Sequence, residues 1–188
     1  MDNSQIIIVV VAVIAGIAIV AAAWIYMQKR RTEQLRSKFG PEYDRAIETG
    51  RDRRKAEAML EERQKRIEKL DIRPLTNEDR QRFQQAWTRE QARFVDDPQG
   101  AVAEADRLIG EVMRARGYPV GDFDQRSADI SVDHPMVVEN YRIAHEIALK
   151  DRRGEASTEH LRKALVHYRA LFEELLENRA AVAKEGRR

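Results

Sequence analysis

The sequence predicts an all-α protein with a single N-terminal transmembrane helix, a helical stalk and a bundle-like domain of four or five helices. Three observations predict this fold. An uninterrupted apolar run covers residues 6–27, the next stretch consists almost entirely of charged helix-forming residues, and the distal part of the chain repeats apolar residues at helical spacing. No segment shows the period-two alternation and β-branched bias of paired strands, so we expect essentially no sheet.

The apolar run of residues 6–27 has the length of a membrane-spanning helix. Its 22 residues rise by about 1.5 Å each, which gives about 33 Å of helix against a hydrocarbon core of roughly 30 Å. Residues 1–5 contain no Lys or Arg, whereas a basic cluster follows the run, so the positive-inside rule predicts residues 1–5 outside the cytoplasm and the following chain inside. The residues expected at the cytoplasmic membrane interface are Trp24, Tyr26, Lys29, Arg30 and Arg31.

A cleaved signal peptide is the alternative interpretation of this run, with Ala21-Ala22-Ala23 as a small-residue cleavage site and a secreted or periplasmic product. A signal peptide has a basic start and an apolar region of about 7 to 15 residues, whereas this chain starts acidic and its basic residues come downstream. We therefore expect an uncleaved anchor in a bacterial inner membrane. Ala12 and Gly16 are spaced for close approach of two helices, which leaves a homo-oligomer open.

Residues 28–75 are expected to form a basic helical stalk. Residues 29–73 contain 15 Lys and Arg against 10 Asp and Glu, whereas residues 74–188 contain 19 against 21, so the stalk is near +5 and the distal part near −2. Gly40-Pro41 and Gly50 divide the stalk into two or three helical pieces.

The stalk pattern favours a solvated spacer over a coiled coil, because Arg63 interrupts its apolar stripe and a coiled coil needs three or four heptads. The largely basic run RDRRK at residues 51–55, with residues 29–31, suggests contact with anionic phospholipid headgroups at about 1 kcal/mol per basic residue. Nucleic acid is not expected as a partner, because acidic residues interleave and no aromatic stacking platform accompanies the basic ones.

Residues 76–177 are expected to fold as the helical bundle, followed by a flexible tail of residues 178–188. Expected helix starts are Thr76, Asp97, Asp133 and Ser157, and Gly117 is an expected helix end. The expected core faces contain Phe83, Trp87, Phe94, Val95, Val102, Ala105, Leu108, Ile109, Val112, Val137, Val138, Tyr141, Ala144, Ala148, Leu161, Ala164, Leu165, Tyr168, Leu171, Phe172 and Leu175.

Parts of this domain resemble a helical module of uncharacterised bacterial proteins that carry one N-terminal transmembrane helix. The resemblance rests on the run FVDDP at residues 94–98, the spaced pattern AD.LI..VM..RGYP at residues 105–119, DHP at residues 133–135 and HYRALFEEL at residues 167–175. It covers about half of the chain. It implies a bacterial origin and this architecture, and it implies no activity.

The chain offers no complete catalytic set, and we expect no cofactor. It has no cysteine, its serines lie in no G-x-S-x-G context, and no Gly-rich phosphate loop follows a strand. A weak metal alternative places His145 and His167 on facing helices, with Glu146 or Glu173. We favour local hydrogen bonding of both histidines at the edge of the core.

The connection of residues 117–126, between two expected helices, is the candidate functional surface because it mixes aromatic, acidic and turn residues. The candidate partner-binding residues are Tyr118, Asp122, Phe123, Asp124 and Arg126. The alternative is a structural hook, in which Tyr118 or Phe123 folds onto the end of the bundle and Asp122 caps a short helix of residues 123–130.

These observations favour a membrane-tethered, non-catalytic interaction or scaffold module on the cytoplasmic face of a bacterial membrane. The expected partners are the lipid bilayer and another protein. A metal-dependent enzyme using His145 and His167 and a lipid-surface organiser acting through the basic stalk are the two alternatives.

Overall fold

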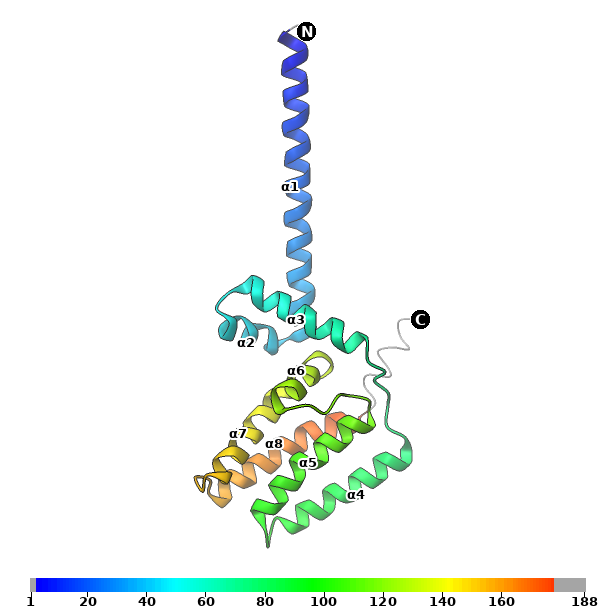
Figure 1. The fold of residues 1–188 in the computed structure, drawn as a ribbon, viewed down its shortest axis with the longest axis vertical. Coiled ribbons are helices and arrows are strands. Elements are labelled where there is room, and N and C mark those ends of the chain that lie inside the picture. The colour runs from blue at the N-terminus through cyan, green and yellow to red at the C-terminus, as the bar shows by residue number, and fades with distance from the viewer. Residues whose placement is uncertain (1–2, 178–188) are drawn as a thin grey trace. The chain divides into compact units, whose positions relative to one another are not determined.

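The computed structural model describes residues 3–177, which form eight α-helices and contain no strand (Figure 1). The helices are α1 (Asn3–Phe39), α2 (Pro41–Gly50), α3 (Arg53–Glu68), α4 (Asn77–Arg93), α5 (Pro98–Ala115), α6 (Phe123–Asp133), α7 (Val138–Arg152) and α8 (Thr158–Leu176). The all-α prediction is therefore confirmed. The predicted flexible tail of residues 178–188 lies outside the described residues.

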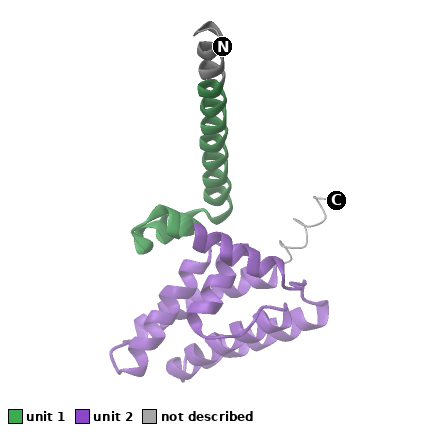
Figure 2. Cartoon of the chain, turned by 45° about the horizontal axis from the view of Figure 1, so that its top comes forward, with its two compact units in different colours: residues 1–57 green, residues 58–188 purple. Residues whose placement is uncertain are grey.

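The chain divides into two compact units, Met1–Glu57 and Ala58–Arg188, drawn green and purple in Figure 2. The division falls inside α3, earlier than the expected end of the stalk at residue 75. The second half of α3 belongs to the second unit because it carries long-range polar contacts there. Arg66 donates to the fully buried carboxylate of Asp129, and Arg63 Nη1 donates to Ser131 Oγ over 3.3 Å.

In the first unit, α1 continues without a break from the apolar run into the charged stalk. Val13–Phe39 is long and apolar enough to cross a membrane, and none of its apolar window is buried. The expected breaks are confirmed: Gly40, at φ 48°, and Pro41 separate α1 from α2, and α2 ends at Gly50. Buried apolar side chains join the end of α1 to α2, namely Leu35, Phe39, Tyr43 and Ala46.

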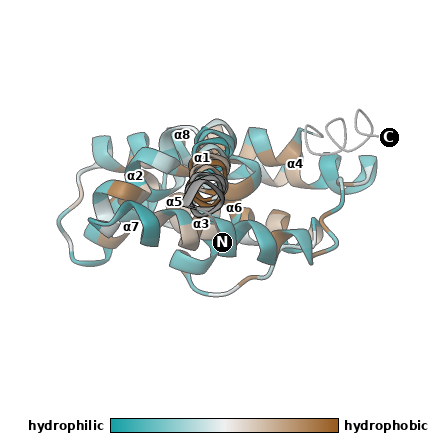
Figure 3. Ribbon diagram, turned by 90° about the horizontal axis from the view of Figure 1, so that it is seen from above, coloured by the Kyte–Doolittle hydropathy of each residue, from teal (hydrophilic) through white to brown (hydrophobic). Residues whose placement is uncertain are grey.

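The second unit is a helical domain in which α5 and α8 are central: α5 packs on α4 and α8, and α8 packs on α7. Trp87 of α4 stacks on Phe172 of α8, with ring centroids 4.6 Å apart and planes 20° apart. Figure 3 shows teal and brown residues mixed along α4 and α7, the colouring of amphipathic helices. Most of the predicted core positions are buried, among them Phe83, Trp87, Leu108, Ile109, Val112, Tyr141, Tyr168, Leu171, Phe172 and Leu175.

Side chains cap the helices of this domain at the positions that the sequence predicts. Thr76 Oγ1 accepts the N–H of Asp79 over 3.0 Å, and Asp97 accepts that of Gly100 over 2.9 Å. Ser157 accepts the N–H of His160 over 3.3 Å. Each cap satisfies a backbone donor that the helix itself leaves free.

Two expectations about this domain are wrong. Asp133 does not start a helix but ends α6, because Pro135 forces the preceding His134 out of the helical region, to φ −132°. Helix α7 begins only at Val138. Val95 is 82% exposed rather than part of the core, because α4 has ended at Arg93 and Val95 lies in the following turn.

Candidate functional site

A groove of about 470 Å³ lies where the start of α6 meets α7, and we call it the α6–α7 groove. Its lining residues are Asp122, Phe123, Asp124, Arg142, His145, Glu146 and Leu149. Three of the five predicted partner-binding residues therefore lie together here. They share the groove with His145, which the sequence offered only as a weak metal ligand.

A stacked pair of rings forms the floor of the α6–α7 groove. Phe123 lies on His145 with ring centroids 3.6 Å apart and planes 6° apart, and it meets the buried ring of Tyr141 at 4.8 Å. Burial lowers the pKa of His145, so its imidazole is neutral at pH 7. A neutral imidazole on a phenyl ring makes a flat and largely apolar shelf.

Carboxylates border this shelf. Asp122 caps α6 by accepting the N–H of Gln125 over 2.8 Å, and Glu146 pairs with Lys150 over 2.9 Å. Asp124 is exposed, and its carboxylate makes no hydrogen bond or ion pair to the residues that the structure describes. Asp124 is therefore the acid at this rim that is available to an incoming group.

Arg126 does not line the groove but turns into the domain. Its guanidinium approaches Asp106 of α5, with Nη2 and Oδ2 separated by 3.6 Å, and it lies 5.6 Å from the ring of Tyr141. Its side chain is only 13% exposed. The predicted role of Arg126 as an exposed binding residue therefore has no support in its placement, because the face of α6 that carries it packs inward.

Asp106 appeared in the sequence only as part of the resemblance pattern, with no role assigned. It lies beside the buried hydroxyl-bearing rings of Tyr141 and Tyr168. Burial first, and then the charge of Asp106, raises the pKa of both tyrosines. The only sequence signal is that an acid directly follows Ala105 on the apolar stripe of α5. This polar cluster links α5, α6, α7 and α8 inside the domain.

Tyr118 is buried and is therefore not the exposed partner-binding residue that the sequence had suggested. Its placement corresponds to the alternative of a structural hook. It is 2% exposed, and its hydroxyl donates to Asp133 Oδ2 over 2.6 Å. Burial and the nearby Asp133 charge raise the pKa of Tyr118. The chain turns toward the domain interior at Gly117, just before the buried ring. Gly117 adopts φ 93°, and a Cβ atom at this position would collide with the carbonyl oxygen of Asp71.

The neighbouring Arg116 is 1% exposed and holds this turn to the end of α8. Its Nη1 donates to the carbonyl oxygen of Leu175 over 3.0 Å and lies 3.4 Å from His134 Nε2. His134 Nδ1 lies 3.2 Å from Glu174 Oε1. Residues 116–119, the RGYP part of the sequence pattern, therefore have a structural role: their contacts hold the α5–α6 connection in place.

The two histidines of the metal alternative have separate surroundings. His145 stacks on Phe123, whereas His167 Nδ1 lies 2.8 Å from Asn140 Oδ1. Within residues 3–177, no group of three or more His, Asp or Glu side chains is placed to hold a metal ion. The described residues thus give the metal alternative no assembled ligand set.

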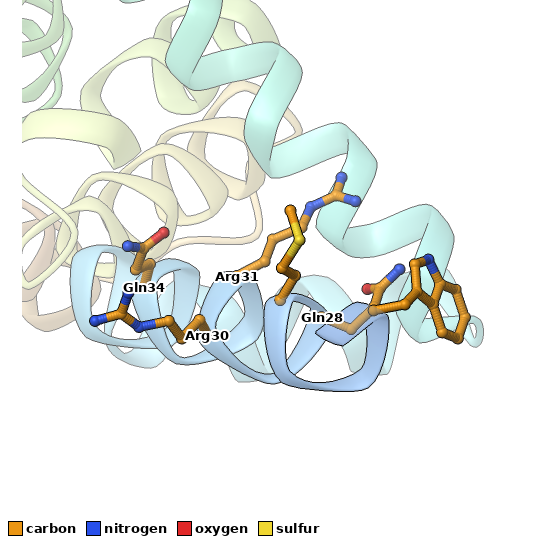
Figure 4. Close-up of a pocket in the computed structure, with 6 residues that line it drawn as sticks. Gln28, Arg30, Arg31 and Gln34 are labelled. Carbon is orange, nitrogen blue, oxygen red and sulfur yellow. The ribbon is translucent and has the colours of Figure 1, made fainter. Parts of the chain in front are cut away.

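The predicted membrane-interface residues lie on α1 and are accessible. Trp24 is 57% exposed, Tyr26 is 60% exposed, and the guanidinium of Arg30 lies 5.6 Å from the Tyr26 ring. Arg30 and Arg31 also border a depression of about 510 Å³ along α1, shown in Figure 4 with Gln28 and Gln34. Aromatic and basic side chains therefore follow the apolar part of α1 within two helical turns.

Comparison with known proteins gives no relative: no family model, no curated protein and no solved structure matches the chain. The resemblance to a bacterial helical module stays a prediction.

Proposed function

We propose that the protein is a single-pass protein of a bacterial inner membrane, with its N-terminus outside and its helical domain in the cytoplasm, where it acts as a non-catalytic interaction module. The observation that carries the proposal is the apolar window of α1, none of which is buried. Such a surface is stable in water only when another apolar phase covers it, and its length suits a bilayer. The basic residues that follow on α1 support the orientation.

A signal sequence near the N-terminus would also be long and apolar enough to pass as a span. Two features favour an anchor. Helix α1 continues without interruption through the basic residues to Phe39, and Phe39 is fully buried.

We propose the α6–α7 groove as the partner-binding surface. Its shelf of Phe123 and His145 offers apolar area, and the neighbouring Leu149 is 38% exposed. The acids Asp124 and Glu146 lie at the rim. The matching partner is a protein segment that presents an apolar side chain flanked by Lys or Arg.

In-cell crosslinking tests this surface. A photo-crosslinking residue placed at Arg142, which lines the groove, should capture a partner of the full-length protein. Combining it with Phe123→Ser and Leu149→Ser should abolish the capture. The matched control is Val166→Ser, which changes an apolar residue of α8 that is 54% exposed and lies outside the groove. Equal capture by all variants would contradict binding in the groove.

A further inference from the structure

We infer that the first unit carries a binding site for the phosphate headgroup of an anionic phospholipid, between α1 and the start of α3. This inference rests on the proposed membrane anchoring and adds a specific ligand to it. The site is a hollow of about 390 Å³, which we call the α1–α3 hollow. Its lining residues are Trp24, Ile25, Gln28, Lys29 and Thr32 of α1, and Arg53, Arg54 and Glu57 of α3.

The base of the α1–α3 hollow is fixed by Glu57, which is 6% exposed. Its Oε1 accepts hydrogen bonds from Thr32 Oγ1 over 2.9 Å, from Tyr43 Oη over 2.7 Å and from Arg53 Nε over 3.0 Å. Burial opposes ionisation of Glu57, but these donors outweigh it and lower its pKa. The ionised carboxylate therefore holds α3 against α1 and keeps the walls of the hollow in place.

Positive charge remains in the hollow after Glu57 has been paired. Lys29 and Arg54 are exposed, and among the residues that the structure describes their side chains form no hydrogen bond or ion pair. Three basic residues and one acidic residue line the hollow, which leaves a net charge of +2. An ammonium and a guanidinium on facing walls suit a phosphate, which the guanidinium can bind through two parallel hydrogen bonds.

The positive charge of the α1–α3 hollow comes from side chains and not from the amino end of α3. The carboxylate of Asp52 already accepts the backbone N–H of Arg54 over 2.9 Å and that of Lys55 over 3.4 Å. The first donors of α3 are thus occupied by the protein's own acid. An anion in the hollow must be recognised by Lys29 and Arg54.

The order of apolar and basic groups along α1 selects a lipid over a soluble phosphate. Trp24 and Ile25 continue the exposed apolar face and form one wall of the hollow. Lys29 follows Trp24 by five residues, a rise of about 7.5 Å. A phospholipid places its acyl chains and its phosphate in the same order, so one molecule fits both walls, whereas a free phosphate would use only the basic one.

Lipid titration of the full-length protein in neutral detergent tests the inference, with bound lipids counted by native mass spectrometry. The wild type should retain phosphatidylglycerol in preference to phosphatidylcholine. Lys29→Gln combined with Arg54→Gln should weaken phosphatidylglycerol binding about tenfold or more, since one basic residue near an anionic surface contributes about fivefold.

The matched control removes two charges from the same helices outside the hollow, by Lys38→Gln with Lys65→Gln, both exposed. The phosphatidylglycerol affinity of this control variant should stay within about twofold of that of the wild type. All variants should have equal helix content by circular dichroism. Equal loss in both double variants would show diffuse attraction and overturn the site. Release of the lipid by millimolar inorganic phosphate would overturn the lipid as its ligand.

Failure of the anchoring itself would appear in a different measurement. If the protein fractionates with soluble proteins from cells, the proposed anchor and the lipid site on it are both contradicted. If the protein stays in the membrane and the titration shows no preference for phosphatidylglycerol, only the lipid site is overturned.

Discussion

Tyr118 and Phe123 lie in the same connection but meet opposite surroundings. Tyr118 is 2% exposed and bonds to Asp133, whereas Phe123 lies at the surface of the α6–α7 groove and stacks on His145. The first side chain therefore contributes to folding, whereas the second lines the groove that we propose as the binding surface. A sequence pattern that pairs two aromatics in one loop does not separate these roles, because burial depends on how the loop lies on the domain.

We predict that Tyr118→Ser lowers the free energy of unfolding by about 3 kcal/mol, because it removes a buried ring. Tyr118→Phe keeps the ring, loses the bond to Asp133 and should cost about 1 kcal/mol. Phe123→Ser should cost about 1 kcal/mol, since its ring is only partly buried. Chemical denaturation of the full chain in detergent measures all three, and an equal cost for Tyr118→Ser and Phe123→Ser would contradict the assignment.

His134 makes the stability of the helical domain depend on pH. Its Nδ1 can donate to Glu174 while its Nε2 accepts from Arg116, which requires a neutral ring. Burial first, and then the charge of Arg116, lowers its pKa from the ordinary value of 6.5, although Glu174 and Asp133 act in the opposite direction. Below pH 6.5 the unfolded chain therefore binds more protons at this position than the folded chain does.

The stability that neutral His134 provides is thus complete above pH 6.5 and is lost as the pH falls toward the lowered folded-state pKa. Denaturation between pH 7 and pH 5 should show a steeper loss of stability for the wild type than for His134→Gln. Identical slopes for the wild type and His134→Gln would show that other groups cause the dependence.

At the scale of elements, helix caps and breaks are the features that the sequence predicts best. Thr76, Asp97 and Ser157 act on residues three positions away, and Gly40-Pro41 acts on its own backbone, so local sequence is sufficient. Packing between distant elements is not predictable in this way. Asp106 and Arg126 come from α5 and α6 and meet only because the helices pack, so the sequence pattern missed the first and misplaced the second.

The connection between α5 and α6 depends on the glycine at its start. Gly117 and Gly154 both adopt positive φ, of 93° and 73°, but only Gly117 has backbone where a side chain would be. We predict that Gly117→Ala costs about 3 kcal/mol, from the left-handed conformation together with the collision at Asp71. Gly154→Ala should cost about 1 kcal/mol, from conformation alone. Thermal denaturation compares the two, and an equal cost would mean that Asp71 moves away freely.

At the scale of the whole molecule, the span and its flanking charges follow from composition, since hydropathy and the placement of basic residues are properties of the sequence itself. The division of the chain inside α3 does not follow from composition. It depends on contacts such as that between Arg66 and Asp129, which lie 63 residues apart. Those contacts fall in the second unit, to which the last part of the expected stalk belongs.

Topology mapping of the full-length protein in bacterial cells tests the tethered-module proposal most directly. A fluorescent protein fused to the C-terminus should be active, and an alkaline phosphatase that works only in the periplasm should stay silent in the same position. Mass spectrometry of the untagged protein should find residues of the apolar run still attached to the 188-residue chain. An active phosphatase, or a mature chain that begins near Trp24, would contradict an uncleaved anchor with a cytoplasmic domain.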